Sequence, residues 1–276
     1  MTDFDKKYLA ILNECLNDGV EQYTDRVKMK TKALFGIDLD LDSNKFPLLT
    51  LRKTSPKFFI AETLWFFTGT KKLDFFQKFS KGWDSFKDTN NNIESNYGYR
   101  WRRYFKRDQI ESLVEMLVNE PSSRQGVLCT WDPATDGLAS PKKQSGVPCG
   151  CMTVFNVLDG KLFCHVIFRS EDLILGITHD VPGASLLQHI IAQKVGLDVG
   201  RLHFSISNAQ VYEVNYDQAK ELSLRIHEHA EIILKLPQNS YDRAIAGDES
   251  LVEEIYQNIN EQYHPLQDLG KISIAI

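Results

Sequence analysis

The stretch CMTVFNVLDGKLFCHVIF, residues 151–168, decides the fold class, because it contains two strand-like runs joined by Asp159 and Gly160. Both runs are rich in the β-branched and aromatic residues that are typical of strands. An Asp-Gly pair between such runs predicts a tight hairpin with a type I′ turn, in which both central residues need a positive φ. The turn also sets the register, with residue 158 opposite residue 161 and further pairs stepping outward from there.

Cys149 stands just before this hairpin, after the loop residues Val147 and Pro148. By the register of the turn it lies opposite Ser170, with Arg169 beside it. Directly paired Cβ atoms are about 4.5–5.5 Å apart, so a guanidinium can lie close enough to favour a thiolate. The sequence therefore indicates a candidate nucleophile. The alternative is a small buried apolar residue, which is a common role of free cysteines.

Two reactions suit a thiolate flanked by arginine. Acyl transfer needs a histidine base, but His165 is expected to face Val154, five residues along the strand from Cys149. Conjugate addition to an electron-poor ring needs only the thiolate, a bound anion and a proton relay. The pattern favours conjugate addition over a cysteine acyl-transferase.

The rest of the chain predicts an α+β protein in a single domain, residues 1–276. Apolar residues or helix-start signals indicate helices at Asp3 to about Gly19, from Pro56, at Gln109 to Asn119 and at Gly183 to Gly196. Two further strands are expected at LHFSIS (202–207) and EIILKL (231–236). Helices and strands are interleaved without a regular βαβ pattern, which favours α+β over α/β.

Composition and charge narrow the class of protein. The chain has 276 residues, 42% hydrophobic and 25% charged, which is typical of a soluble globular protein. A net charge of -5 gives no general attraction to DNA or to an anionic membrane. No apolar run reaches the ~20 residues of a membrane span, and the N-terminus carries acids where a signal peptide has a basic start. We therefore expect a cytoplasmic protein.

The five cysteines are expected to be free thiols, because their number is odd and the chain has no export signal. Cys149 and Cys151 form a CxC, but no second Cys or His pair stands at a zinc-ligand spacing. We therefore expect no bound metal.

A series of short motifs runs along the chain: FPLLT (46–50), ETLWFF (62–67), GWD (82–84), NYGYRWR (96–102), PSSR (121–124), VPC (147–149), RSEDLILG (169–176), ASLLQHIIAQ (184–193), YHP (263–265) and IAI (274–276). In this order and near this spacing, the motifs resemble the thymidylate synthase family, which includes pyrimidine-nucleotide hydroxymethylases. The resemblance implies a mixed sheet packed by helices and a homodimer formed through the sheet. It also implies 5,10-methylenetetrahydrofolate as co-substrate and a nucleotide monophosphate as substrate.

The same resemblance implies roles for individual residues. Cys149 is the nucleophile that adds to C6 of the pyrimidine, and Glu62 and Tyr97 belong to the proton-relay network. The implied phosphate ligands are Arg26, Arg169, Ser170 and Arg124, the last supplied by the partner subunit. The implied folate-site residues are Trp83, Asp172, Leu175, Gly176 and Ile276.

Asp180 is the departure from the family pattern that indicates the substrate. Eleven residues after Arg169, thymidylate synthases carry an asparagine that reads uracil, and the deoxycytidylate hydroxymethylase branch carries an aspartate. A carboxyl group can give a proton to N3 of cytosine and accept from the 4-amino group. Gly150, where methylating enzymes have a histidine, and ESNYG (94–98) are also similar to that branch. We therefore expect hydroxymethylation of dCMP, with CMP as a second substrate.

Other departures from the family pattern leave more than one activity possible. Gln125 replaces the second arginine of a pair, VKMKT (27–31) replaces a Gly-rich stretch, and Gln210 replaces the histidine that reaches the sugar, whereas Tyr212 is kept. The alternatives are C5 methylation of the cytosine nucleotide, a thymidylate synthase acting on dUMP, and an inactive relative that binds nucleotide or RNA. Retention of Cys149, Glu62, Tyr97 and Asp172 together argues against the inactive relative.

Overall fold

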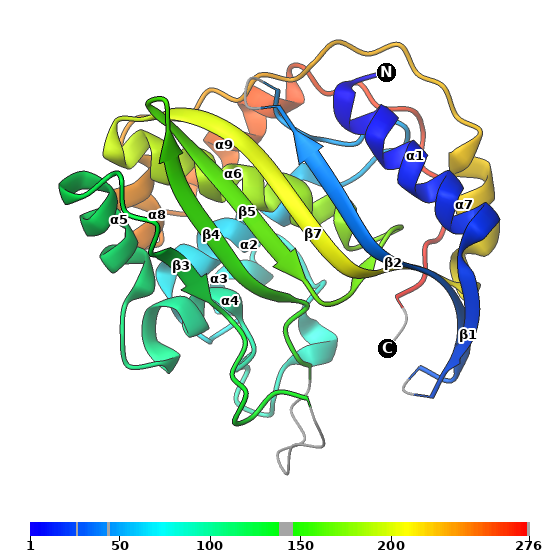
Figure 1. The fold of residues 1–276 in the computed structure, drawn as a ribbon, viewed down its shortest axis with the longest axis horizontal. Helices are drawn as coiled ribbons and strands as arrows, with labels where there is room; N and C mark the ends of the chain where they lie inside the picture. The colour runs from blue at the N-terminus through cyan, green and yellow to red at the C-terminus, as the bar shows by residue number, and fades with distance from the viewer. Residues whose placement is uncertain (26, 43–44, 138–145, 275–276) are drawn as a thin grey trace.

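The structure, a computed structural model, describes residues 1–25, 27–42, 45–137 and 146–274. Within these residues one mixed sheet has the strand order β1-β2-β7-β5-β4-β3, with β6 paired to β7 (Figure 1). The strands are β1 (Val20–Thr24), β2 (Met29–Leu41), β3 (Gly126–Cys129), β4 (Gly150–Leu158), β5 (Lys161–Phe168), β6 (Glu171–Asp172) and β7 (Asp198–Tyr212). β5 and β6 run parallel to β7, whereas the other pairs are antiparallel.

Helices pack against this sheet, so the predicted α+β class is confirmed. They are α1 (Asp3–Asp18), α2 (Pro56–Thr68), α3 (Asp74–Gln77), α4 (Tyr97–Tyr99), α5 (Gln109–Asn119), α6 (Ile177–Val195), α7 (Tyr216–Ser223), α8 (Ser240–Ala246) and α9 (Ser250–Asn260). In Figure 1, α2, α6 and α9 lie behind the sheet. None of the helices in the described ranges is long and apolar enough to cross a membrane.

The predicted hairpin forms between β4 and β5. Asp159 and Gly160 have φ values of 51° and 70°, as a type I′ turn requires. The register holds from the turn out to Met152 opposite Ile167 and then shifts, so that Gly150 pairs with Phe168. A residue inserted in one strand produces such a bulge, and here it leaves Cys151 without a direct partner across β5.

The bulge corrects the expected position of Cys149. Its carbonyl accepts a hydrogen bond from the backbone N–H of Arg169 at 3.0 Å, so Cys149 lies opposite Arg169 and not opposite Ser170. The correction places the thiol and the guanidinium on directly paired residues. His165 faces Val154, as expected, and its Nε2 lies 3.0 Å from Oγ of Ser205.

Two other expectations about single elements are wrong. Helix α6 begins at Ile177, six residues before the expected start at Gly183. Ile177 and Val181 are fully buried, and this burial outweighs the backbone hydrogen bond that Pro182 removes.

Residues 231–236 form no strand, apart from an isolated bridge between Ile232 and Phe46. Side-chain amides accept hydrogen bonds from the backbone of this segment instead. The N–H of Ile233 donates to the side chain of Gln262 at 3.0 Å, and that of Lys235 donates to the side chain of Asn258 at 2.8 Å. The apolar run therefore packs as an extended segment beside α9.

The two faces of the sheet differ in what covers them. The face toward α2 and α6 is buried and carries Phe155, Val166 and Phe204. The opposite face, turned to the viewer in Figure 1, carries half-buried Phe163 and Ile167. Apolar side chains that are left uncovered on one sheet face indicate a contact surface.

Candidate active site

A pocket lies between α2, α6 and the buried face of the sheet. Three of the expected catalytic residues, Glu62, Tyr97 and Asp180, line it together with Gly150, the neighbour of Cys149. Most of the remaining lining is apolar: Phe66, Trp101, Val166, Phe168, Ala184 and Leu187. A few convergent polar groups in an apolar pocket are typical of a small-molecule site.

Arg169 is held directly beside Cys149. Its Nε donates to the carbonyl of Pro148 at 2.9 Å, and its Nη2 donates to that of Val147 at 3.1 Å. Nη2 also lies 3.9 Å from Sγ of Cys149, and the guanidinium stacks over the ring of Trp131 at 5.6 Å. A fixed positive charge at this distance favours the thiolate form.

Glu62 is a buried carboxyl group on α2, and its Oε1 accepts a hydrogen bond from Nε1 of Trp83 at 2.5 Å. Burial, together with the negative charge of Asp180, raises the pKa of Glu62 to about 8. Glu62 is therefore mainly protonated at neutral pH, and it can exchange a proton with a bound molecule near that pH.

Tyr97 connects this wall of the pocket to the cysteine loop. Its hydroxyl accepts a hydrogen bond from the backbone N–H of Gly150 at 3.0 Å. Burial and the neighbouring Cys149 hold the pKa of Tyr97 well above its usual range. The hydroxyl therefore keeps its proton and can donate it into the pocket.

Asp180 lies in the first turn of α6, and its side chain is half-buried. Burial raises the pKa of Asp180 to about 7. A carboxyl group with this pKa is present in both protonation states at neutral pH, so it can act as either donor or acceptor.

The residues expected to bind the phosphate and the sugar form a second group. Nε2 of Gln210 donates to Oγ of Ser170 at 3.1 Å and to the hydroxyl of Tyr212 at 2.8 Å. Arg124 is exposed in the segment between α5 and β3, and it is not part of this group. Arg26 lies outside the described residues.

The residues expected to bind folate meet where β6 leads into α6. Oδ1 of Asp172 accepts from the backbone N–H groups of Ile174 at 2.8 Å and Leu175 at 3.3 Å, and Gly176 caps the helix. Burial raises the pKa of Asp172 to about 6. Trp83 donates a hydrogen bond to Glu62, and Ile276 lies outside the described residues.

Glu171 was not expected to belong to the site, although it stands inside the RSEDLILG motif. Glu171 is 3% exposed, and its Oε1 lies beside Gly176 at the start of α6. The signal available in the sequence was an acidic residue in a short strand, directly between two expected ligands.

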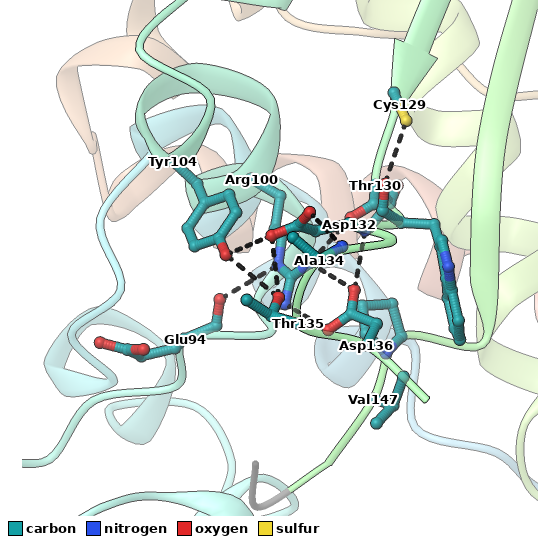
Figure 2. A network of polar contacts seen from close by, with 12 residues as sticks. Glu94, Arg100, Tyr104, Cys129, Thr130, Asp132, Ala134, Thr135, Asp136 and Val147 are labelled. Carbon is teal, nitrogen blue, oxygen red and sulfur yellow. Dashed lines mark hydrogen bonds and ion pairs between the residues drawn. The ribbon is translucent and has the colours of Figure 1, made fainter. Parts of the chain in front are cut away.

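The structure also contains a buried ion pair that the sequence did not predict. Arg100 and Asp136 are both fully buried, with Nη1–Oδ2 and Nη2–Oδ1 distances of 2.5 and 2.9 Å (Figure 2). Arg100 also donates to the carbonyl of Thr130 at 3.1 Å. Because Thr130 lines the pocket and Trp131 lies under Arg169, this network stabilises one wall of the site.

We expect Asp136→Ala to lower the free energy of unfolding by about 3–5 kcal/mol, because the Arg100 charge is then buried without its carboxylate. Asp242→Ala is the matched control, since its ion pair with Lys194 is exposed and is worth about 0–1 kcal/mol. Urea unfolding of both variants at one protein concentration measures the difference. Equal losses of stability would contradict a structural role for the buried pair.

Within the described residues, no group of three or more His, Cys, Asp or Glu side chains is arranged to hold a metal ion. All five cysteines are described, and none of them forms a disulfide.

Comparisons with known proteins match most of the chain. The family model described as thymidylate synthase matches residues 6–261. Among solved structures, the chain is similar to the thermostable thymidylate synthase A from Bacillus subtilis, with a TM-score of 0.73 and 28% sequence identity, over 83% of this chain and 87% of that chain. The family model spans the sheet and the pocket, and the chain therefore belongs to the thymidylate synthase family.

Proposed function

We propose that this protein transfers a one-carbon unit from 5,10-methylenetetrahydrofolate to C5 of a cytidine 5′-monophosphate and releases the 5-hydroxymethyl nucleotide. Its family implies folate-dependent one-carbon transfer to C5 of a nucleotide. The choice of cytosine rests on one observation: Asp180 presents a half-buried carboxyl group, with a raised pKa, to the pocket that Glu62 and Tyr97 line.

Cys149 starts the reaction in this proposal. Its thiolate, favoured by the Arg169 guanidinium 3.9 Å away, adds to C6 of the base. The electron pair of the C5–C6 double bond moves toward N3, which makes C5 nucleophilic toward the one-carbon unit. Loss of the C5 proton and of tetrahydrofolate then leaves an exocyclic methylene on the ring.

The protonation state of Asp180 supports cytosine as the base. As a neutral acid it gives a proton to N3 of cytosine and accepts from the 4-amino group. Uracil presents the opposite pattern, with a donor at N3 and an acceptor at O4. An ionised carboxyl facing O4 would be left without a partner, at a cost of about 1–3 kcal/mol.

Water is the proposed second nucleophile, and it adds to the exocyclic methylene. Gly150 lies at the pocket wall beside Cys149 and presents no side chain there that could exclude a water molecule. The Tyr97 hydroxyl and the Glu62 carboxyl line the same pocket, and Glu62 can accept a proton from that water.

The direct test is incubation of the protein with methylenetetrahydrofolate and dCMP, CMP or dUMP. Mass spectrometry of the nucleotide distinguishes a hydroxymethyl product from a methyl product. Absorbance distinguishes tetrahydrofolate, which accompanies hydroxymethylation, from dihydrofolate, which accompanies methylation. A methyl product, or turnover of dUMP alone, would overturn the proposal.

The proposed enzyme is a homodimer in which Arg124 reaches the phosphate in the partner's site. Two features support this: the partly uncovered Phe163 and Ile167 on one sheet face, and the exposed position of Arg124 between α5 and β3. A twofold dimer places the same residue at both sites.

Subunit mixing tests this arrangement. Cys149→Ser and Arg124→Ala subunits should each be nearly inactive alone. Random mixing after unfolding and refolding is expected to restore about a quarter of wild-type activity, since half of the dimers then contain one intact site. Mixing with a Cys149→Ser, Arg124→Ala double variant is the control. Failure of the single variants to complement each other would refute a shared site.

A further inference from the structure

Polar and titratable side chains form a cluster on the sheet face opposite α2 and α6. They come from three neighbouring strands, because Asp40 pairs with His203 across β2 and β7, and His203 pairs with His165 across β7 and β5. Asp38 and Ser205 form the next pair of β2 and β7 on the same face. The two histidine rings meet edge to face, with their centroids 4.6 Å apart. The proposed reaction uses none of these residues.

His203 lies at the centre of this cluster, and each of its ring nitrogens faces a carboxylate. Nδ1 lies 3.0 Å from Oδ1 of Asp40, and Nε2 lies 3.3 Å from Oδ1 of Asp38. A carboxylate accepts hydrogen bonds and donates none, whereas a neutral imidazole carries only one N–H. Both ring nitrogens therefore present a proton to a carboxylate only when the ring is an imidazolium.

The contacts of Ser205 require the same proton. Its hydroxyl has one proton and two lone pairs, and it donates the proton to Oδ1 of Asp38 at 2.9 Å. Nε2 of His203 at 3.2 Å and Nε2 of His165 at 3.0 Å therefore donate to its two lone pairs. With Nε2 of His203 protonated in this way, Nδ1 needs a second proton to donate to Asp40. Burial and the neighbouring His203 lower the pKa of His165, so His165 stays neutral and donates from Nε2 alone.

The charge of the cluster depends on whether His203 carries this second proton. With both histidines neutral, Asp38 and Asp40 supply two negative charges and Arg201, 3.7 Å from Asp40, supplies one positive charge, which leaves −1. Lys7 of α1 neutralises a carboxylate of its own helix and donates to the backbone carbonyl of Asp40. An imidazolium at His203 brings the sum to zero.

The cluster continues directly into an apolar part of the same sheet face. One row of paired residues crosses this face from β3 to β2: Val127, Val154, His165, His203 and Asp40. Val127 is 42% exposed, and Val154 is half-buried. Neighbouring strands are about 4.8 Å apart, so a partner that covers the two valines also removes water from the histidines beside them.

We propose that two copies of this chain take up one proton per subunit, carried by His203, when they associate through this sheet face. This inference rests on the proposed homodimer and adds a control of its assembly by pH. In a twofold dimer the same patch of both subunits meets. A cluster with a charge of −1 repels its own copy and loses its water at a cost, whereas the protonated cluster is neutral. A basic partner, by contrast, would favour the unprotonated cluster.

The dimer should therefore be tighter at pH 6 than at pH 8, the range in which histidine titrates. Because the dimer binds more protons than two separate subunits, lowering the pH favours the dimer. A proton whose affinity rises about tenfold on association changes the equilibrium by up to about tenfold, and a dimer has two such protons. We expect a dissociation constant about ten- to a hundredfold lower at pH 6 than at pH 8. Sedimentation equilibrium of the full chain measures it at both pH values.

His203→Gln separates this role from simple packing. The glutamine amide is neutral at both pH values and still carries a donor and an acceptor. The dissociation constant of this variant should differ by less than about twofold between pH 6 and pH 8. His227→Gln is the matched control, because His227 lies after α7, with its Nε2 2.8 Å from the carbonyl of His264, and its variant should keep the wild-type pH dependence.

Two further variants keep the test decisive. If His203→Gln fails to fold, Asp40→Asn removes the carboxylate that faces Nδ1 and should also reduce the pH dependence. If wild type stays dimeric at the lowest measurable concentration, Val127→Ala removes apolar contact area and brings dissociation into range, with and without His203→Gln. Calorimetry of dilution, in buffers of different ionisation enthalpy, should show proton release on dissociation of wild type and none from His203→Gln.

The possible results distinguish the proton linkage from the dimer itself. A dissociation constant that is equal at pH 6 and pH 8, a tighter dimer at pH 8, or a pH dependence that persists in His203→Gln would overturn the linkage and leave the proposed function intact. A wild-type chain that is monomeric at both pH values would overturn the proposed homodimer, and this inference with it.

Discussion

Replacing Cys149 by serine is expected to abolish turnover while nucleotide binding is retained. A serine hydroxyl is neutral at the pH of the assay and cannot add to C6 as a thiolate does, even with the Arg169 guanidinium beside it. Removal of a covalent nucleophile typically costs about four to six powers of ten in kcat. Product formation measured by mass spectrometry, and dCMP affinity measured by calorimetry, report the two effects separately.

Cys151→Ser provides the matched control. Cys151 is the bulged residue of β4, and its Sγ lies 3.9 Å from the carbonyl oxygen of Cys149. It has no role in the proposed reaction, so its variant should stay within about tenfold of wild type. Tritium at C5 of dCMP adds a third readout, because wild type should release it into water during turnover and Cys149→Ser should not. Turnover of Cys149→Ser within tenfold of wild type would refute the addition mechanism.

The hairpin shows how far local sequence can predict this fold. Its turn and its pairing follow from Asp159 and Gly160, because turn chemistry is local. The bulge at Cys151 has no such signal, because Cys151 and Met152 are both apolar and hide the break in the burial alternation between Gly150 and Thr153. Prediction from the sequence therefore put Arg169 beside Cys149 but named the wrong residue opposite it.

The larger errors in the predicted secondary structure arise from contacts between residues that are distant in the sequence. β2 was not predicted, because lysines and aspartates such as Lys32 and Asp38 interrupt its apolar residues, and its partners on β7 are distant in sequence. Residues 231–236 have strand propensity, but side-chain amides near α9 bind their backbone instead. Propensity alone cannot decide between these partners.

The site residues also fall into those that the sequence predicts and those that it does not. Glu62, Tyr97 and Asp180 were each recognised from a family motif, and the fold brings them to one pocket. Glu171 belongs to such a motif as well, but its burial beside Gly176 depends on the pairing of β6 with β7 and on where α6 begins. Spacing in the sequence does not place Glu171 beside Gly176 before the start of α6 is known.

Replacing Asp180 by asparagine is expected to shift the preference from cytosine toward uracil nucleotides. The asparagine amide donates to O4 and accepts from N3–H of uracil, whereas against cytosine it sets donor against donor and acceptor against acceptor. Asp172→Asn is the matched control, because it changes a neighbouring buried acid that faces the β6–α6 turn and should leave the base preference unchanged.

The size of the shift follows from the number of mismatched hydrogen bonds. Each buried polar group left unpaired costs about 1–3 kcal/mol, so two mismatches should change the ratio of specificity constants by about one to four powers of ten, at about 1.4 kcal/mol per tenfold. Competition between dCMP and dUMP, and then between CMP and UMP, measures this ratio for wild type and both variants. An unchanged preference in Asp180→Asn would mean that Asp180 does not read the base, and the assignment of cytosine would then fail.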